Sequence, residues 1–127
     1  MSEEKLTTFL NVDVELRSKS SLKELGTYLS KSVFMLSNDE FFIAFEARFD
    51  PGTLDDLIRR LVQIVHALPP RLRTIWDQCE SRRFDLGIEA GLHPPVKTGD
   101  MSSETIELLA GVQAEMRITI YSAKADN

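Results

Sequence analysis

The stretch that decides the fold is DPGTLDDLIRRLVQIVHALPPRLRTIWDQCESRRFDLGIEAG, residues 50–91. Apolar residues recur every three or four positions from Leu54 to Leu68, which predicts a helix with one wide apolar face. Asp50-Pro51 predicts the start of this helix, with a carboxylate cap followed by proline at the first helical position. Pro69-Pro70 must interrupt the helix, because proline lacks the N–H donor and clashes with the preceding turn.

A second helix and a strand complete this stretch. The helical period resumes at Leu72, Ile75, Trp76 and Cys79. Residues 84–90 then alternate between apolar and polar side chains, which predicts a strand with one buried face and one wet face. Two consecutive helices followed by such a strand predict a helical layer packed on a sheet.

The N-terminal part of the chain predicts three more strands and a short helix. A polar break at residues 18–21 separates the first strand from an apolar-faced helix over residues 22–29. A short apolar run at residues 33–36 and a turn at residues 37–40 precede the third alternating segment. The core-facing residues are expected to be Leu10, Val12, Val14 and Leu16 in the first strand, and Phe41, Ile43, Phe45, Ala47 and Phe49 in the later one.

The C-terminal part begins with the long irregular loop of residues 92–101. Ser102 predicts an N-cap, and Ile106 and Leu109 predict the apolar side of the helix that follows. Residues 117–121 predict a closing strand with Ile118 and Ile120 inside.

The predicted order of elements is β-α-β-β-α(α)-β-α-β. Its first six elements fit a ferredoxin-like split β-α-β, with helices on one face of a mostly antiparallel sheet. The last helix and strand extend it. We therefore expect residues 1–127 to form a single two-layer α+β domain.

Three segments carry a resemblance to a known family. They are FDLGIEAG at residues 84–91, SSETI at residues 102–106 and RITIY at residues 117–121, separated by the loop. In this layout the chain resembles the C-terminal half of a family of small bacterial proteins catalogued only as a domain of unknown function. The resemblance implies a fold and a bacterial source, and it implies no activity.

Composition and charge narrow the classes of partner. The 127 residues carry 20 acidic and 15 basic side chains, for a net charge of −5. We therefore expect a basic protein partner rather than nucleic acid or an anionic membrane. The arginines at positions 71, 73, 82 and 83 indicate a solvated helix end. We expect a cytoplasmic protein, because the sequence starts with acidic residues and shows no apolar leader. In addition, no apolar run approaches the length of about 20 residues that a membrane helix needs.

No motif in the sequence predicts catalysis. The six glycines form no phosphate-binding loop, and no nucleophile and base occur in a known signature. The one cysteine allows neither an intrachain disulfide nor a cysteine-rich metal site. We expect no enzyme activity, no cofactor and no metal.

The polar face of the predicted sheet is the first candidate site. It is either a solvated surface with weak cross-strand ion pairs, or a surface that docks a basic protein, as an immunity-type inhibitor does. The residues expected to form it are Asp13, Glu15, Glu46, Arg48, Asp85, Glu89 and Tyr121.

The loop of residues 92–101 is the second candidate. It holds His93, Lys97 and Asp100, and binding residues are frequent in loops. Prolines before a glycine also explain a rigid turn without any chemistry. The alternative function is therefore a small-molecule-binding regulatory module with a pocket near this loop. Self-association through the closing strand, as in a homodimer, is another alternative.

Overall fold

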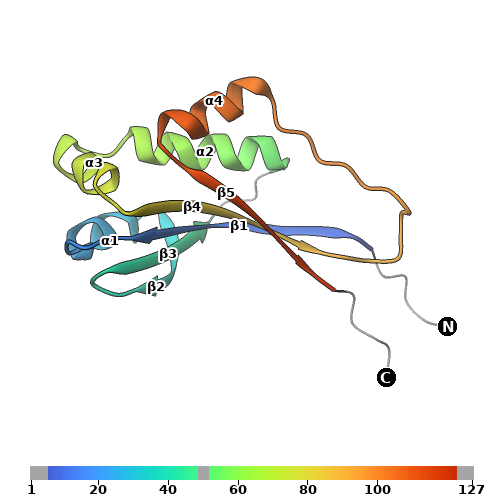
Figure 1. Ribbon diagram of the computed structural model, residues 1–127, viewed down its shortest axis with the longest axis horizontal. Coiled ribbons are helices and arrows are strands. Elements are labelled where there is room, and N and C mark those ends of the chain that lie inside the picture. The colour runs from blue at the N-terminus through green and yellow to red at the C-terminus, as the bar shows by residue number, and fades with distance from the viewer. Residues whose placement is uncertain (1–5, 49–51, 123–127) are drawn as a thin grey trace.

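The computed structural model describes residues 6–48 and 52–122. These residues form four helices and one five-stranded sheet (Figure 1). In chain order the elements are β1 (Thr8–Arg17), α1 (Lys23–Leu29), β2 (Val33–Asn38), β3 (Phe42–Ala47), α2 (Leu54–His66), α3 (Pro70–Asp77), β4 (Ser81–Glu89), α4 (Ser103–Gly111) and β5 (Glu115–Tyr121). The protein is therefore α+β, as the sequence predicts. None of these helices is long and apolar enough to cross a membrane.

The strand order of the sheet is β2-β3-β1-β4-β5. β3 lies between β1 and β2 and pairs antiparallel with both, while β4 pairs antiparallel with the other side of β1. This arrangement confirms the predicted ferredoxin-like split β-α-β, with α2 and α3 in the place of its second helix. The extra strand β5 pairs with β4 in parallel. The sheet is therefore mixed, although the other three neighbouring pairs are antiparallel as expected.

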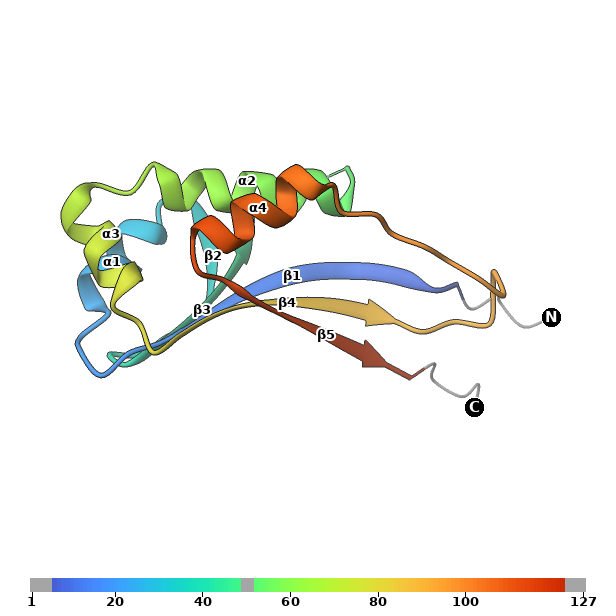
Figure 2. The ribbon, with the colours of Figure 1, turned by 45° about the horizontal axis from the view of Figure 1, so that its top comes forward.

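The helices lie on one side of the sheet and leave the opposite side open (Figure 2). Between the two layers, Val14, Phe45 and Phe84 from the strands pack in one core with Ile58 and Leu61 from α2. Full burial of such a side chain contributes about 1.5–3 kcal/mol to stability. The predicted alternation of the three central strands therefore fixes which side of each strand is covered by helices.

Helix α2 begins later than the sequence predicts. Its N-cap is Thr53, whose hydroxyl accepts a hydrogen bond from Asp56 N at 3.1 Å. Gly52 has a φ of 72°, a left-handed conformation that glycine adopts easily and that separates the preceding chain from the helix. The predicted cap at Asp50-Pro51 is therefore wrong, and these two residues lie outside the described part of the chain. The predicted break at Pro69-Pro70 is confirmed, because α3 starts at Pro70.

Trp76 and Arg82 fasten α3 to the end of α4. The indole of Trp76 is fully buried, and its Nε1 donates a hydrogen bond to the carbonyl oxygen of Val112 at 2.9 Å. Arg82 donates from Nη1 to the carbonyl oxygen of Cys79 at 2.6 Å and from Nε to that of Gln113 at 3.0 Å. A guanidinium group at this position satisfies carbonyl groups that the end of a helix leaves without partners.

Two residues expected in the core from the N-terminal strands are exposed. A bulge between Phe9 and Asn11 shifts the register of β1 against β4, so that Leu10 is 52% exposed and Phe9 packs against the core instead. Phe41 is also 52% exposed, because it belongs to the turn before β3. Phe49, a third residue expected in the core, lies outside the described residues.

Helix α4 starts where the sequence predicts, and of the two residues expected on its apolar side Leu109 is buried and Ile106 is not. The hydroxyl of Ser102 accepts a hydrogen bond from Thr105 N at 3.1 Å, which confirms the N-cap. The buried residues are Thr105, Leu109 and, just after the helix, Val112. Ile106, expected on the apolar side, points elsewhere and is 54% exposed.

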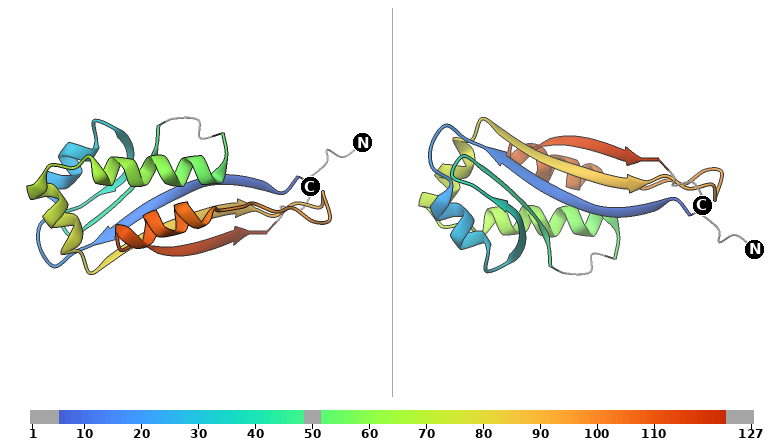
Figure 3. Two further views of the ribbon diagram at one scale, coloured as in Figure 1. Left: turned by 90° about the horizontal axis from the view of Figure 1, so that it is seen from above. Right: turned by 90° about the horizontal axis from the view of Figure 1, so that it is seen from below.

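Strand β5 is the clearest departure from the prediction. Ile118 and Ile120 were expected inside, but they are 60% and 66% exposed. Their register partners in β4 are Leu86 and Ile88, so they do lie on the helical side of the sheet. They are exposed because β5 is an edge strand, and α4 covers only its first part (Figure 3).

Trp76→Phe is expected to lower the free energy of unfolding by about 2 kcal/mol, because it leaves the Val112 carbonyl without its donor and opens a cavity. Urea denaturation measures the change. Tyr28→Phe is the matched control, because no hydrogen bond to the Tyr28 hydroxyl occurs within the described residues. A change of less than about 0.5 kcal/mol in Trp76→Phe would contradict the importance of this contact.

Candidate functional site

The open face of the sheet brings three carboxylates together. Asp13 of β1 lies directly opposite Glu46 of β3 and directly opposite Asp85 of β4. Residues in such positions have Cβ atoms about 4.5–5.5 Å apart. We call Glu46, Asp13 and Asp85 the acid row, and it crosses the three central strands of the sheet.

The central carboxylate of the acid row has a strongly shifted pKa. The pKa of Asp13 is raised to about 6, first by burial of the carboxyl group and then by the charges of Glu46 and Asp85. A hydrogen bond with Glu46 and the charge of Glu15 act in the same direction. At neutral pH the three side chains therefore repel one another, and like charges directly opposite each other destabilise a sheet.

The polar neighbours of the acid row do not neutralise it. Asn11 Nδ2 donates a hydrogen bond to Glu46 Oε2 at 3.1 Å, and Thr119 Oγ1 donates to Asp85 Oδ1 at 2.7 Å. Within residues 6–48 and 52–122, no ion pair joins the acid row to a basic side chain. In the same part of the chain, no cluster of His, Cys, Asp and Glu could hold a metal ion.

Of the other predicted residues of this face, Glu15 lies near the acid row and the rest lie apart from it. Glu15 is partly neutralised by Arg83, whose Nη1 lies 3.8 Å from Glu15 Oε1. The guanidinium carbon of Arg48 lies 5.6 Å from the ring centre of Phe34. Glu89 and Tyr121 lie opposite each other at the far ends of β4 and β5, four residues beyond the level of Asp85. The structure thus brings together Asp13, Glu46 and Asp85, with Glu15 near enough for its charge to raise the pKa of Asp13.

The four arginines interpreted from the sequence as a helix end all have acceptors within the chain, but only Arg71 and Arg73 lie on a helix, because Arg82 and Arg83 belong to β4. Arg71 Nη2 pairs with Glu24 Oε2 at 2.9 Å, and Arg73 Nε pairs with Asp77 Oδ1 at 3.0 Å. The other two are Arg82, bound to backbone carbonyls, and Arg83, which contacts Glu15 and Glu115. This cluster therefore contributes to internal contacts.

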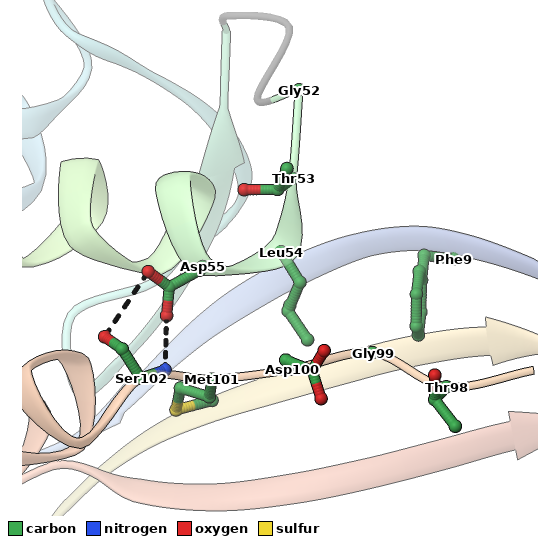
Figure 4. A pocket seen from close by; sticks show the side chains of 10 residues that line it. All are labelled: Phe9, Gly52, Thr53, Leu54, Asp55, Thr98, Gly99, Asp100, Met101 and Ser102. Atoms are coloured by element: carbon green, nitrogen blue, oxygen red, sulfur yellow. Dashed lines mark hydrogen bonds between the residues drawn. The ribbon is translucent and has the colours of Figure 1, made fainter.

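A pocket of about 590 Å³ lies between the start of α2 and the end of the 92–101 loop (Figure 4). Asp55 Oδ1 accepts a hydrogen bond from Ser102 N at 2.8 Å, which ties the loop to the helix and lowers the pKa of Asp55. The lining residues are Phe9, Gly52, Thr53, Leu54, Asp55, Thr98, Gly99, Asp100, Met101 and Ser102.

One wall of the pocket depends on a glycine. A Cβ atom on Gly99 would lie 2.5 Å from Phe9 Cζ, so a larger residue would displace the ring. Of the loop residues selected from the sequence, Asp100 lines the pocket, whereas His93 and Lys97 do not. His93 O accepts a hydrogen bond from Thr7 N at 2.9 Å, and Lys97 Nζ donates to Thr7 O at 2.8 Å. These two residues hold the loop against the start of the chain.

The apolar side chains of the pocket were not identified from the sequence. Phe9 precedes the bulge in β1, Leu54 follows the true N-cap of α2, and Met101 ends the loop. A capping threonine just after glycine was the available signal for the first turn of α2. No local signal places these three distant segments around one cavity.

Comparisons with family models, with curated proteins and with solved structures found no match to this chain.

Asp13→Asn is expected to raise the free energy of unfolding at pH 7–8 by about 1 kcal/mol. This is less than the pKa shift of Asp13 alone would imply, because the carboxyl group is half exposed and solvent screens its charge. The folded pKa of Asp13 is raised, so stability falls as pH rises from about 4 through about 6 and is constant above. The advantage of Asn should therefore vanish near pH 4.

Denaturant unfolding at several pH values checks this difference. Glu107→Gln, an exposed change on α4, is the control and should alter stability by less than about 0.5 kcal/mol at each pH. A stability difference for Asp13→Asn that does not depend on pH would show that the acid row is not strained by charge.

Proposed function

We propose that this protein is a non-catalytic binding protein that docks a basic protein partner on the open face of its sheet. The observation that carries the proposal is the acid row, in which Asp13 lies between Glu46 and Asp85 with no basic partner among the described residues. A Lys or Arg side chain from a partner would relieve the repulsion that the free protein contains. Perturbed carboxylates of this kind are frequent at functional sites.

The charge of the whole chain supports the same partner. A net charge of −5 attracts a basic protein over distances of about a Debye length and speeds its encounter with the acid row. Within this class, an immunity-type inhibitor that masks a basic toxin or enzyme fits this charge and the absence of a catalytic motif from the sequence.

A labelled arginine-rich peptide tests the charge recognition by fluorescence anisotropy. Asp13→Lys is expected to weaken binding by at least about tenfold, because it places a cation at the centre of the site. The same substitution turns the row into alternating charges and should stabilise the free protein. Binding should also weaken as pH falls from 7 to 5, because Asp13, with a pKa of about 6, must lose its proton to pair with a cation.

Glu107→Lys is the matched control, because it changes the net charge equally on α4, on the helical side. Equal weakening by Glu107→Lys and Asp13→Lys would mean that only net charge matters, and would refute docking at the acid row. A lysate pull-down with wild-type and Asp13→Lys baits then identifies the natural partner as a basic protein retained by wild type alone.

The pocket supports a second candidate function, the binding of a small organic cation. The pocket has an apolar lining formed by Phe9, Leu54 and Met101. The pocket volume of about 590 Å³ is in the usual range for ligand sites. Asp100 adds a carboxylate that no hydrogen bond or ion pair engages within the described part of the chain. An aromatic amine therefore fits the lining better than an aromatic acid.

Thermal shift with phenethylamine, 2-phenylethanol and phenylacetate tests the pocket. The amine should raise the melting temperature by a few degrees at saturating concentration through mass action, and the acid should not. Asp100→Asn should reduce the shift for the amine and leave that for the alcohol unchanged. Equal shifts for the three compounds, or for wild type and Asp100→Asn, would count against this function.

A further inference from the structure

The outer edge of the sheet at β5 indicates a further contact. Among the described residues no strand pairs with this edge, because β5 ends the strand order and pairs with β4 alone. The carbonyl oxygen of Tyr121 accepts a hydrogen bond from Ala90 N at 2.8 Å, so residue 121 directs its amide groups toward the β4 side. Successive strand residues direct these groups to opposite sides, so Met116, Ile118 and Ile120 direct theirs outward.

The same three residues expose apolar side chains. Met116, Ile118 and Ile120 are 38%, 60% and 66% exposed on the helical side of the sheet. In the view from above, α4 covers the start of β5 and leaves its second half uncovered (Figure 3). Free amide groups and exposed apolar side chains therefore coincide at one strand.

Ile106 of α4 extends this apolar surface. Arg59 of α2 pairs with Glu104 Oε1 at 2.9 Å, so that side of α4 faces α2. Ile106 comes two residues later, about 200° around the helix, and therefore points away from α2 toward the outer edge of the sheet. We call Ile106, Met116, Ile118 and Ile120 the edge strip.

The opposite edge of the sheet has a protection that β5 lacks. The register of β2 shifts between Met35 and Ser37, and such a bulge discourages pairing with another chain. β5 keeps a regular register along its whole length and contains no proline or lysine. A regular apolar edge without these devices is expected where the strand pairs with another chain.

We propose that β5 pairs with β5 of a second copy of this chain, antiparallel, around a two-fold axis through Ile118. Ile118 is the middle residue of the seven-residue strand, so this register overlaps both strands completely. It sets Ile118 opposite its own counterpart and Met116 opposite Ile120 of the second copy. All three residues direct their amide groups outward, as the hydrogen-bonded pairs of an antiparallel ladder require.

The charges on β5 favour a second copy over a charged partner. In this register Arg117 faces Thr119 of the second copy and Glu115 faces its Tyr121, so no like charges lie directly opposite. The edge strip itself is uncharged, which gives a strongly basic or acidic protein nothing to pair with. A self-complementary patch of this kind is what a two-fold interface requires.

Sedimentation velocity and light scattering of the full chain, at about 1 to 100 µM, test the proposal. The mass is expected to rise from one copy to two over this range and to stop there, because a two-fold contact closes on itself. A wild-type chain that stays monomeric up to the highest concentration overturns the proposal, and so does growth into larger assemblies.

Ile118→Lys locates the contact. It is expected to raise the dissociation constant by at least about tenfold, because it removes apolar burial and sets two like charges opposite each other. Leu36→Lys on β2 is the matched control, since Leu36 is 50% exposed at the other edge. If Leu36→Lys abolishes the dimer, or if Ile118→Lys leaves it intact, the contact does not lie at β5 and the proposal is overturned. Circular dichroism checks folding, and Ile120→Lys replaces any variant of Ile118 that fails to fold.

Ile118→Cys tests the register. Hydrogen-bonded antiparallel partners have Cα atoms about 5.5 Å apart, a distance that a disulfide spans. Mild oxidation should therefore join two copies of Ile118→Cys, while the buried Cys79 does not take part. Thr119→Cys should stay unlinked, because its opposite residue is Arg117. Equal linkage of both variants overturns the two-fold axis through Ile118.

Discussion

The complete burial of alternate residues in the central strand is the constraint on which the other features depend. Val12, Val14 and Leu16 of β1 are fully buried under the helices, and each contributes about 1.5–3 kcal/mol. Their burial forces Asp13 onto the open face, between two other carboxylates. A shift of one residue in register would relieve the repulsion but would place the carboxylates in the core. Because the apolar contributions exceed a repulsion of about 1 kcal/mol, the chain keeps its register and the acid row stays strained.

The fold could be predicted where a sequence pattern has one physical meaning. Alternation in residues 84–90 and the helical period of residues 54–68 report which side of an element is apolar, and both interpretations are correct. Alternation does not report whether anything covers that side, so it predicts Ile118 in the core although this residue is 60% exposed. A bulge reverses the facing of a single residue, as at Leu10, and the sequence carries no clear sign of it. The prediction of where α2 starts is wrong because two helix-start signals, a proline and a capping threonine, lie within four residues of each other.

The sequence could predict which residues belong to the candidate site, but it could not predict which of them lie next to one another. The sequence indicates that Asp13, Glu46 and Asp85 share a face, since each alternates with core residues of its strand. Their contact depends on the register of β1 with two strands whose facing residues lie 33 and 72 positions further along the chain, and this register follows from the packing of the whole core. The pocket is still harder to foresee, because its walls come from residue 9, the first turn of α2 and the end of a loop.

The acid row and the edge strip lie on different sides of the sheet and need not compete. An antiparallel β5–β5 contact has its two-fold axis perpendicular to the sheet, so it joins the two copies into one continuous ten-stranded sheet with a common open face. Both acid rows then face the same way, while the edge strips meet on the helical side. A basic partner with two cationic segments could engage both rows at once and gain avidity without any new contact, provided that its segments span the distance between them. Dimerisation through β5 would in this way turn a modest electrostatic attraction at each acid row into tighter binding.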